Sequence, residues 1–172
     1  MNPNARKLAL TAHVVSSVGF LGAVAVFLAL SIGGLVLQDQ LSVRAAYVAM
    51  DMTAWWVILP LCIGTLVTGV ISSVGTTWGL VRYYWVAIKL VITVLSTILL
   101  LVHMQPIAHV ATAAADASWS GANLHATRVQ LVANAAAASL ALLVATALSI
   151  YKPRGMTPHG WRKQREPVPA PR

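Results

Sequence analysis

Four long apolar segments are the feature that most constrains how this chain can fold. They span residues 8–37, 46–73, 83–105 and 126–151, and each reaches the length of about 20 residues that a helix needs to cross a bilayer. No water satisfies backbone amides and carbonyls inside a bilayer, so such segments must be helical. With short loops between them, the sequence predicts an all-α, polytopic membrane protein, a four-transmembrane-helix up-down bundle.

The composition supports this class and leaves no room for a separate soluble domain. Of the 172 residues, 58% are hydrophobic and 9% are charged, whereas a soluble domain has about 25% charged residues. We therefore expect one membrane domain over residues 1–151. Residues 152–172 form a basic, proline-rich tail that we expect to be disordered.

The positive charge lies mostly outside the apolar segments. The formal net charge of +8 would raise the question of nucleic-acid binding in a soluble protein. Here lysine and arginine gather before the first segment, between the second and third, and in the tail. This is the pattern of the positive-inside rule. It predicts that both termini are cytoplasmic and that the partner is the lipid bilayer, with no nucleic acid.

The third segment carries ionisable groups at both of its ends. Such groups are expensive inside a bilayer and point by default at a cavity, a partner or a ligand. Because an α-helix turns by about 100° per residue, the polar residues between the two cations lie on the same face of the helix as the cations themselves. The stripe consists of Lys89, Thr93, Ser96, Leu100 and His103. We expect it to face the interior of the bundle.

A first candidate site pairs this stripe with the first segment. His13 and Lys89 should lie at the same depth, near the cytoplasmic side, where the sequence offers no carboxylate. One interpretation is that Lys89 extends its ammonium to the headgroups. The other is that Lys89 binds an anionic ligand, such as a porphyrin propionate or a quinone or lipid headgroup, with His13 as axial ligand or proton donor. Haem b is the cofactor that this second interpretation predicts.

A second candidate cluster lies at the outer side. Imidazole and thioether groups together suit copper, and a pair of histidines suits haem iron. The candidate metal ligands are His103, His109, His125 and Asp51, with Met50, Met52 and Met104 nearby and Arg128 as a further cofactor-binding candidate. In the alternative interpretation His109 and His125 are interfacial loop residues and Asp51 pairs with Arg128.

Two prolines are expected to interrupt the helices. Pro60 lies within the second segment, where it should kink the helix, as membrane helices tolerate. Pro106 follows the third segment and permits a new helical start, so a small interfacial helix is expected over residues 107–117. In the first segment, small residues around Ser16 and Gly19 should let a neighbouring helix approach closely.

Short motifs in the first and third segments carry a resemblance. His13 precedes a small-and-aromatic run at residues 19–22, and residues 77–79 (Thr-Trp-Gly) lead through Trp85 to Lys89. The chain resembles bacterial predicted integral membrane proteins of unknown function, distantly similar to the CopD-like copper-resistance membrane domain and to the four-helix membrane protoporphyrinogen oxidase. The resemblance implies a four-helix bundle in the bacterial plasma membrane. It also implies that His13 and Lys89 face a shared site for haem, porphyrin or copper.

Three functional hypotheses follow. The first is a membrane protein that binds haem b between its helices and has a redox or porphyrin-handling role. The second is a copper-binding or copper-transport protein that uses the outer cluster. The third is a cofactor-free membrane subunit or scaffold, with a membrane redox partner or a homo-oligomer as its assembly. The sequence has no nucleotide-binding loop, which argues against an ATPase.

Overall fold

The computed structural model describes residues 2–74, 83–116 and 124–151, together with Gly155, Thr157 and Arg162. These residues form helices, with no strand element among them, and the predicted all-α class is confirmed. Four helical stretches are long and apolar enough to cross a membrane. Their helices are α1 (Pro3–Val36), α2 (Gln40–Thr53), the π-helix η1 (Ala54–Ile58), α3 (Leu59–Val74), α4 (Tyr84–Ala115) and α5 (His125–Tyr151). Residues 75–79 and nearly all of the predicted tail lie outside the described part.

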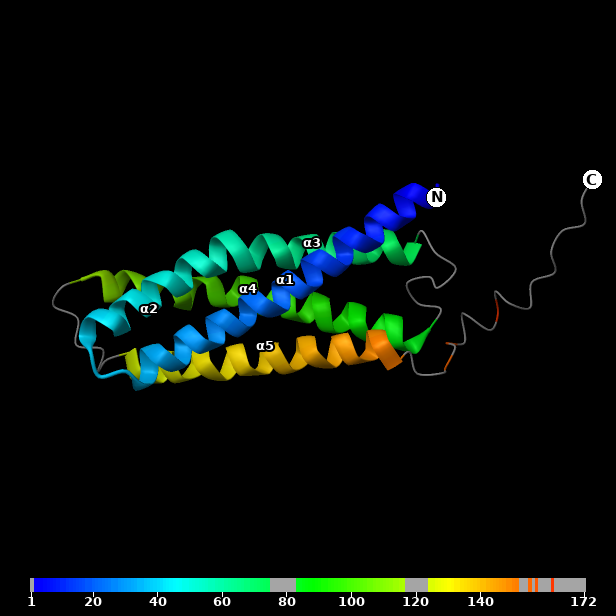
Figure 1. The fold of residues 1–172 in the computed structure, drawn as a ribbon. Helices are drawn as coiled ribbons and strands as arrows, with labels where there is room; N and C mark the ends of the chain where they lie inside the picture. Colours follow the sequence, from blue (N-terminus) through cyan, green and yellow to red (C-terminus); the bar gives the residue numbers. More distant parts are fainter. Residues whose placement is uncertain are drawn as a thin grey trace, which may run out of the picture.

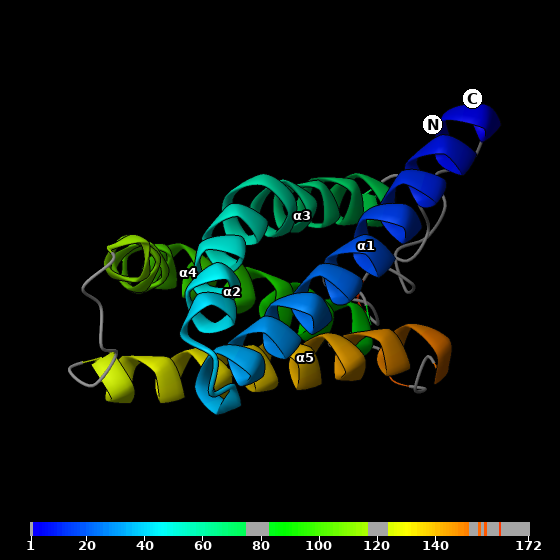
Figure 2. The same ribbon diagram turned by 60° about the vertical axis from the view of Figure 1, so that its left-hand side comes forward.

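The helices alternate in direction along the bundle (Figure 1). α1 begins at the end where α5 finishes, and α3 and α4 meet at that same end, which we call the N-terminal end. α1 crosses the bundle obliquely, lying on α5 in its second half and on α3 in its first half (Figures 1 and 2). The first half of α1 therefore diverges from α5, which separates the helices at the N-terminal end.

Small residues bring α1 and α3 close together. A Cβ at Gly19 would lie 3.3 Å from Leu61, and a Cβ at Gly64 would lie 3.3 Å from Ser16 Oγ. In a membrane, packing of this kind holds helices together because lipid offers no hydrophobic drive for association. The predicted small-residue contact around Ser16 and Gly19 is thus confirmed, with α3 as the neighbour.

The second span is one continuous helical stretch from Gln40 to Val74 that changes type before Pro60. The amide of Leu59 donates to Ala54 O, five residues back, which closes the wider turn of a π-helix. Proline lacks an amide and its ring crowds the preceding turn, and a wider turn relieves both problems. The disturbance expected at Pro60 is therefore absorbed in the turn before it, where Trp55 and Trp56 point outward.

Helix α4 runs through Pro106 without stopping. The expected separate helix over residues 107–117 is wrong, because residues up to Ala115 continue α4. Burial explains the continuation: Ile107, Val110 and Ala114 belong to the core and α4 packs against α2. The core extends from the middle of the bundle to the end opposite the N-terminal end, where Tyr47 and Met50 are among the most deeply buried side chains.

Arg44 of α2 closes the C-terminal end of α4. Its Nε donates to Ala114 O at 2.6 Å and its Nη2 donates to Ala115 O at 2.9 Å. The last carbonyls of a helix have no partner within the helix, and a cation there also opposes the negative end of the helix dipole.

We expect Arg44→Ala to lower the free energy of unfolding by about 1–2 kcal/mol, since two hydrogen bonds from a partly exposed charged group are lost. Thermal unfolding in detergent, followed by helical circular dichroism, measures the effect. Arg44→Lys should recover only part of it, because one ammonium does not reproduce the two-pronged contact. Equal stability of Arg44→Ala and the native protein would contradict this role.

Candidate functional site

A cleft of about 600 Å³ opens at the N-terminal end, between α1, α3, α4 and α5. Its lining on α1 comes mostly from the first half of that helix, which is the half that diverges from α5 (Figure 2). His13 from α1 and Lys89 from α4 both line it. These two residues, predicted to share an interior site from their depth and from the inward direction of the polar stripes, therefore lie on the walls of one cleft.

His13 is held by α3. Its Nδ1 lies 3.2 Å from Thr65 O and 3.2 Å from Thr68 Oγ1. The Thr68 hydroxyl donates to Gly64 O at 2.5 Å, so both partners of Nδ1 act as acceptors. Nδ1 therefore carries the proton of the neutral ring, and Nε2 keeps its lone pair. This is the arrangement by which a protein orients a histidine that ligates a metal.

Gly69 on α3 leaves space for the His13 ring. A Cβ at Gly69 would lie 3.0 Å from His13 Cε1, which is closer than ordinary van der Waals contact. A side chain at this position would require the imidazole to shift away from α3, which carries both partners of Nδ1. The orientation of His13 therefore depends on the absence of a side chain one turn along α3 from Thr65.

Lys89 rests against an aromatic ring of its own helix. Its Nζ lies 5.8 Å from the centroid of the Trp85 ring, one helical turn earlier, which is a cation–π distance. No carboxylate is found among the described residues that line the cleft, whereas Arg6 contributes a further cation. The polar part of the cleft is therefore cationic and suits an anion. Sequence reasoning named Trp85 only in the motif that leads to Lys89, despite its i, i+4 spacing, and did not assign Arg6 to the site.

Two hydroxyl groups in the cleft have no hydrogen-bond partner among the described groups. These are Thr65 Oγ1 and Ser72 Oγ, both buried and both on residues of α3 that line the cleft. Thr65 is only 7% exposed. A buried hydroxyl without a partner costs free energy, and a polar ligand group in the cleft would remove that cost.

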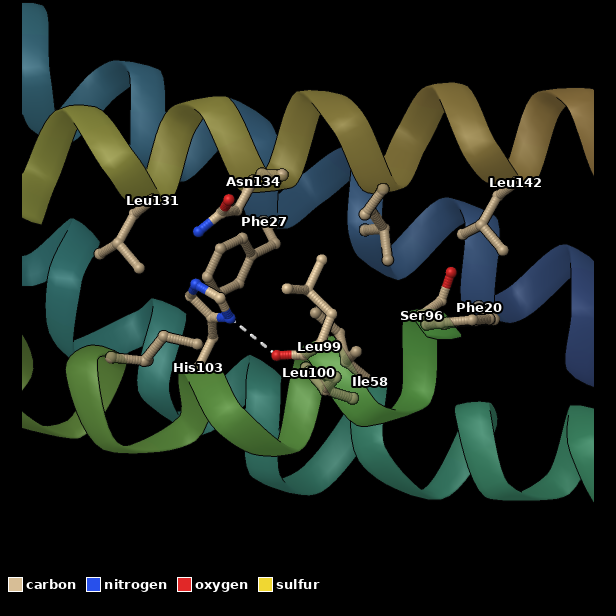
Figure 3. A pocket seen from close by; sticks show the side chains of 14 residues that line it. Phe20, Phe27, Ile58, Ser96, Leu99, Leu100, His103, Leu131, Asn134 and Leu142 are labelled. Carbon is tan, nitrogen blue, oxygen red and sulfur yellow. Dashed lines mark hydrogen bonds between the residues drawn. The ribbon is translucent and has the colours of Figure 1, made fainter. Parts of the chain in front are cut away.

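The polar stripe of α4 divides between two cavities. Lys89 and Thr93 line the cleft, whereas Ser96, Leu100 and His103 line a separate pocket of about 70 Å³ (Figure 3). The whole stripe faces inward, as its helical spacing predicts. His13 and His103 nevertheless belong to different cavities, so they do not serve one site.

The outer cluster does not converge in the described part of the chain. There, no group of three or more His, Cys, Asp or Glu lies close enough to hold a metal ion. His109 and His125 are exposed on α4 and α5, respectively. The described part of the chain therefore offers no cluster of ligands that supports copper binding. Such binding stays a prediction for His103, His109, His125 and Asp51.

Arg128 and Asp51 do not pair with each other. Arg128 Nε donates to Tyr47 Oη at 2.8 Å, and Arg128 Nη2 donates to Gly34 O. Asp51 Oδ1 is buried without a hydrogen-bond partner among the described groups. Arg128 therefore ties α5 to α1 and α2, and it does not reach the cleft that contains His13.

Comparisons with protein-family models, with curated proteins and with solved structures find no match to this chain. The resemblance to the CopD-like and oxidase-like membrane proteins stays a prediction. Two of its features, His13 and Lys89, line the cleft, while residues 77–79 lie outside the described part.

Proposed function

We propose that this protein is a bacterial plasma-membrane protein that binds haem b in the cleft, with a redox or porphyrin-handling role. The observation that carries the proposal is that His13 and Lys89 line one cleft whose polar part is cationic. Haem is an amphipathic anion with an iron that takes an axial imidazole. It combines the three chemical features that the cleft offers, which are an imidazole nitrogen, cations and apolar walls.

The residues present fit the group. A volume of about 600 Å³ falls within the range of about 300–1,000 Å³ typical of ligand and cofactor sites. His13 would supply the axial nitrogen, because its Nδ1 is engaged by α3. Lys89 and Arg6 would neutralise the propionates. Bound haem would supply one-electron chemistry, and the protein's part would be to orient it and to keep water from its apolar face.

The arrangement of charges supports an orientation with both termini in the cytoplasm. Arg6 belongs to the first turns of α1, which begins at the end of the bundle where α5 finishes (Figure 1), and the sequence places further arginine and lysine after Tyr151. Basic residues collect on the cytoplasmic side of membrane proteins. The cleft would then open toward the cytoplasmic half of the bilayer.

The test is an absorption spectrum of the detergent-purified protein, oxidised and reduced, before and after titration with haem. We expect a Soret band with reduced α and β bands. His13→Ala should abolish the ligated spectrum, and Lys89→Met should weaken haem binding by about tenfold or more, because a charge-assisted contact is lost.

The matched control is His109→Ala, which removes an exposed histidine of α4 that does not line the cleft. Its spectrum and haem affinity should equal those of the native protein. The proposal fails if haem added back gives no ligated spectrum, or if His13→Ala and His109→Ala leave the same spectrum. Metal analysis of the same samples would show whether copper is present instead.

A further inference from the structure

A second pocket lies in the middle of the bundle, and the proposed haem site does not use it. Its volume is about 70 Å³, and it is bounded by α1, α4 and α5 with one residue of η1. Its described walls are apolar apart from Ser96, His103 and Asn134. Leu99, which also lines it, is 40% exposed. One wall residue of the pocket therefore also belongs to the outer surface of α4, which faces lipid in a membrane.

Two polar groups point into this pocket from different helices (Figure 3). His103 Nδ1 lies 2.8 Å from Leu99 O, and because a carbonyl only accepts, Nδ1 carries the proton of the neutral ring. His103 Nε2 is therefore a hydrogen-bond acceptor. Asn134 Nδ2, on α5, is buried and has no hydrogen-bond partner among the described groups. These two groups thus offer one acceptor and one donor, within described walls whose remaining polar side chain is Ser96.

A hydroxyl group satisfies both at once, because it donates through its hydrogen and accepts through its oxygen. The described lining holds no Asp, Glu, Lys or Arg, so a neutral occupant fits best. The volume of about 70 Å³ is roughly half that of a cavity of about 150 Å³ that holds benzene. The pocket therefore has room for a head group and its first carbons, and the remainder of the molecule would extend past Leu99 into lipid.

We propose that this pocket binds the hydroxyl head of a neutral, membrane-soluble alcohol or phenol, with His103 Nε2 accepting and Asn134 Nδ2 donating. The apolar side chains of Phe20 and Phe27 form part of the wall around that head. The site is separate from the cleft, so its ligand and the proposed haem are independent of each other.

The experiment titrates the full-length protein in detergent with para-nonylphenol and with decanol, each beside its methyl ether, by isothermal calorimetry. The ether keeps the tail but loses the donor. At least one hydroxyl compound should bind about tenfold more tightly than its ether, the difference expected for a hydrogen bond in apolar surroundings. The compound that binds more tightly than its ether identifies the class of ligand as a phenol or an alcohol. If each hydroxyl compound and its ether bind with equal affinity, the proposal is overturned, because water and not the ligand would then be the hydrogen-bond partner of the polar groups in the pocket.

Two substitutions separate a binding role of Asn134 from a structural one. Asn134→Ala leaves the pocket open but removes the donor to the ligand oxygen, so the hydroxyl compound and its ether, which both accept through oxygen, should each bind more weakly. The preference for the hydroxyl, which comes from the proton that it donates to His103 Nε2, should remain. Asn134→Leu replaces a buried donor without a partner by an apolar group of similar shape, so the thermal midpoint of the ligand-free protein should not fall. A fall in that midpoint together with unchanged affinities for both compounds in Asn134→Ala would overturn the proposal.

The control is Ser139→Ala, on the same helix. The Ser139 hydroxyl donates to Ala135 O within α5 and does not line the pocket. The affinities of this variant for both compounds should equal those of the native protein, and a loss of affinity as large as in Asn134→Ala would also count against the site.

Discussion

Replacing Gly34 with alanine is expected to destabilise the folded protein by about 3 kcal/mol, through overpacking and the loss of hydrogen bonds. A Cβ at this position would lie 2.6 Å from Tyr47 Cζ, and Tyr47 is only 1% exposed. A shift of the ring would also disturb the hydrogen bonds that Arg128 donates to Tyr47 Oη and Gly34 O. One methyl group therefore strains the contact of three helices at once.

The neighbouring glycine provides the control for this prediction. A Cβ at Gly33 would meet only Leu37 Cδ1, at an ordinary 3.6 Å, and alanine favours a helix more than glycine does. Gly33→Ala should therefore leave stability unchanged or raise it slightly. Unfolding of both variants by denaturant titration in detergent, followed by circular dichroism, makes the comparison. Equal destabilisation of the two would show that the contact with Tyr47 is not the cause.

Arg128→Met is expected to cost about 2–3 kcal/mol, the range for hydrogen bonds made by a charged group in partly buried surroundings. Arg128 Nε donates to Tyr47 Oη at 2.8 Å, and its guanidinium carbon lies 5.4 Å from the centroid of the Tyr47 ring. Another N–H group of the same side chain donates to Gly34 O. Methionine keeps the length of the side chain but removes these contacts between α5, α1 and α2.

A double-mutant cycle with Tyr47→Phe isolates the pair. Phenylalanine keeps the ring beneath the guanidinium and removes only the hydroxyl, so we expect this single change to cost about 1 kcal/mol. The double variant should be more stable than the sum of the two single effects predicts, because the Arg128–Tyr47 hydrogen bond is lost only once. Strict additivity would contradict a direct interaction. Arg128→Lys should recover only part of the loss, since lysine lacks the guanidinium fork.

Helical spacing predicted part of the candidate site correctly. Lys89 and His103 lie on one stripe of the third segment, and polar groups on a membrane helix turn away from lipid because their exposure there is costly. Both residues do face inward. Counting residues from the ends of the spans also placed His13 and Lys89 at one depth, which the shared cleft reflects.

Helical spacing gave wrong predictions where contacts between residues far apart in the chain determined the structure. Pro106 predicted an interruption, but packing against α2 carries α4 onward to Ala115, and Arg44 holds its end. The expected gathering of His109 and His125 with His103 required all three to turn inward, yet the first two are exposed. The role of Asn134 left no signal, because a single amide in a helix indicates nothing until its surroundings are known.

The sequence by itself determined that the chain forms apolar helices, the order of the spans, and which face of α4 turns inward. These properties are local, since they depend on the period of a helix and on the cost of placing polar groups in lipid. The tertiary structure alone decided which faces meet. The oblique course of α1, with Gly19 and Gly64 allowing close approach to α3 and Gly34 admitting Tyr47, separates α1 from α5 at one end and opens the cleft. Those contacts join residues far apart in the chain, so no local pattern specifies them.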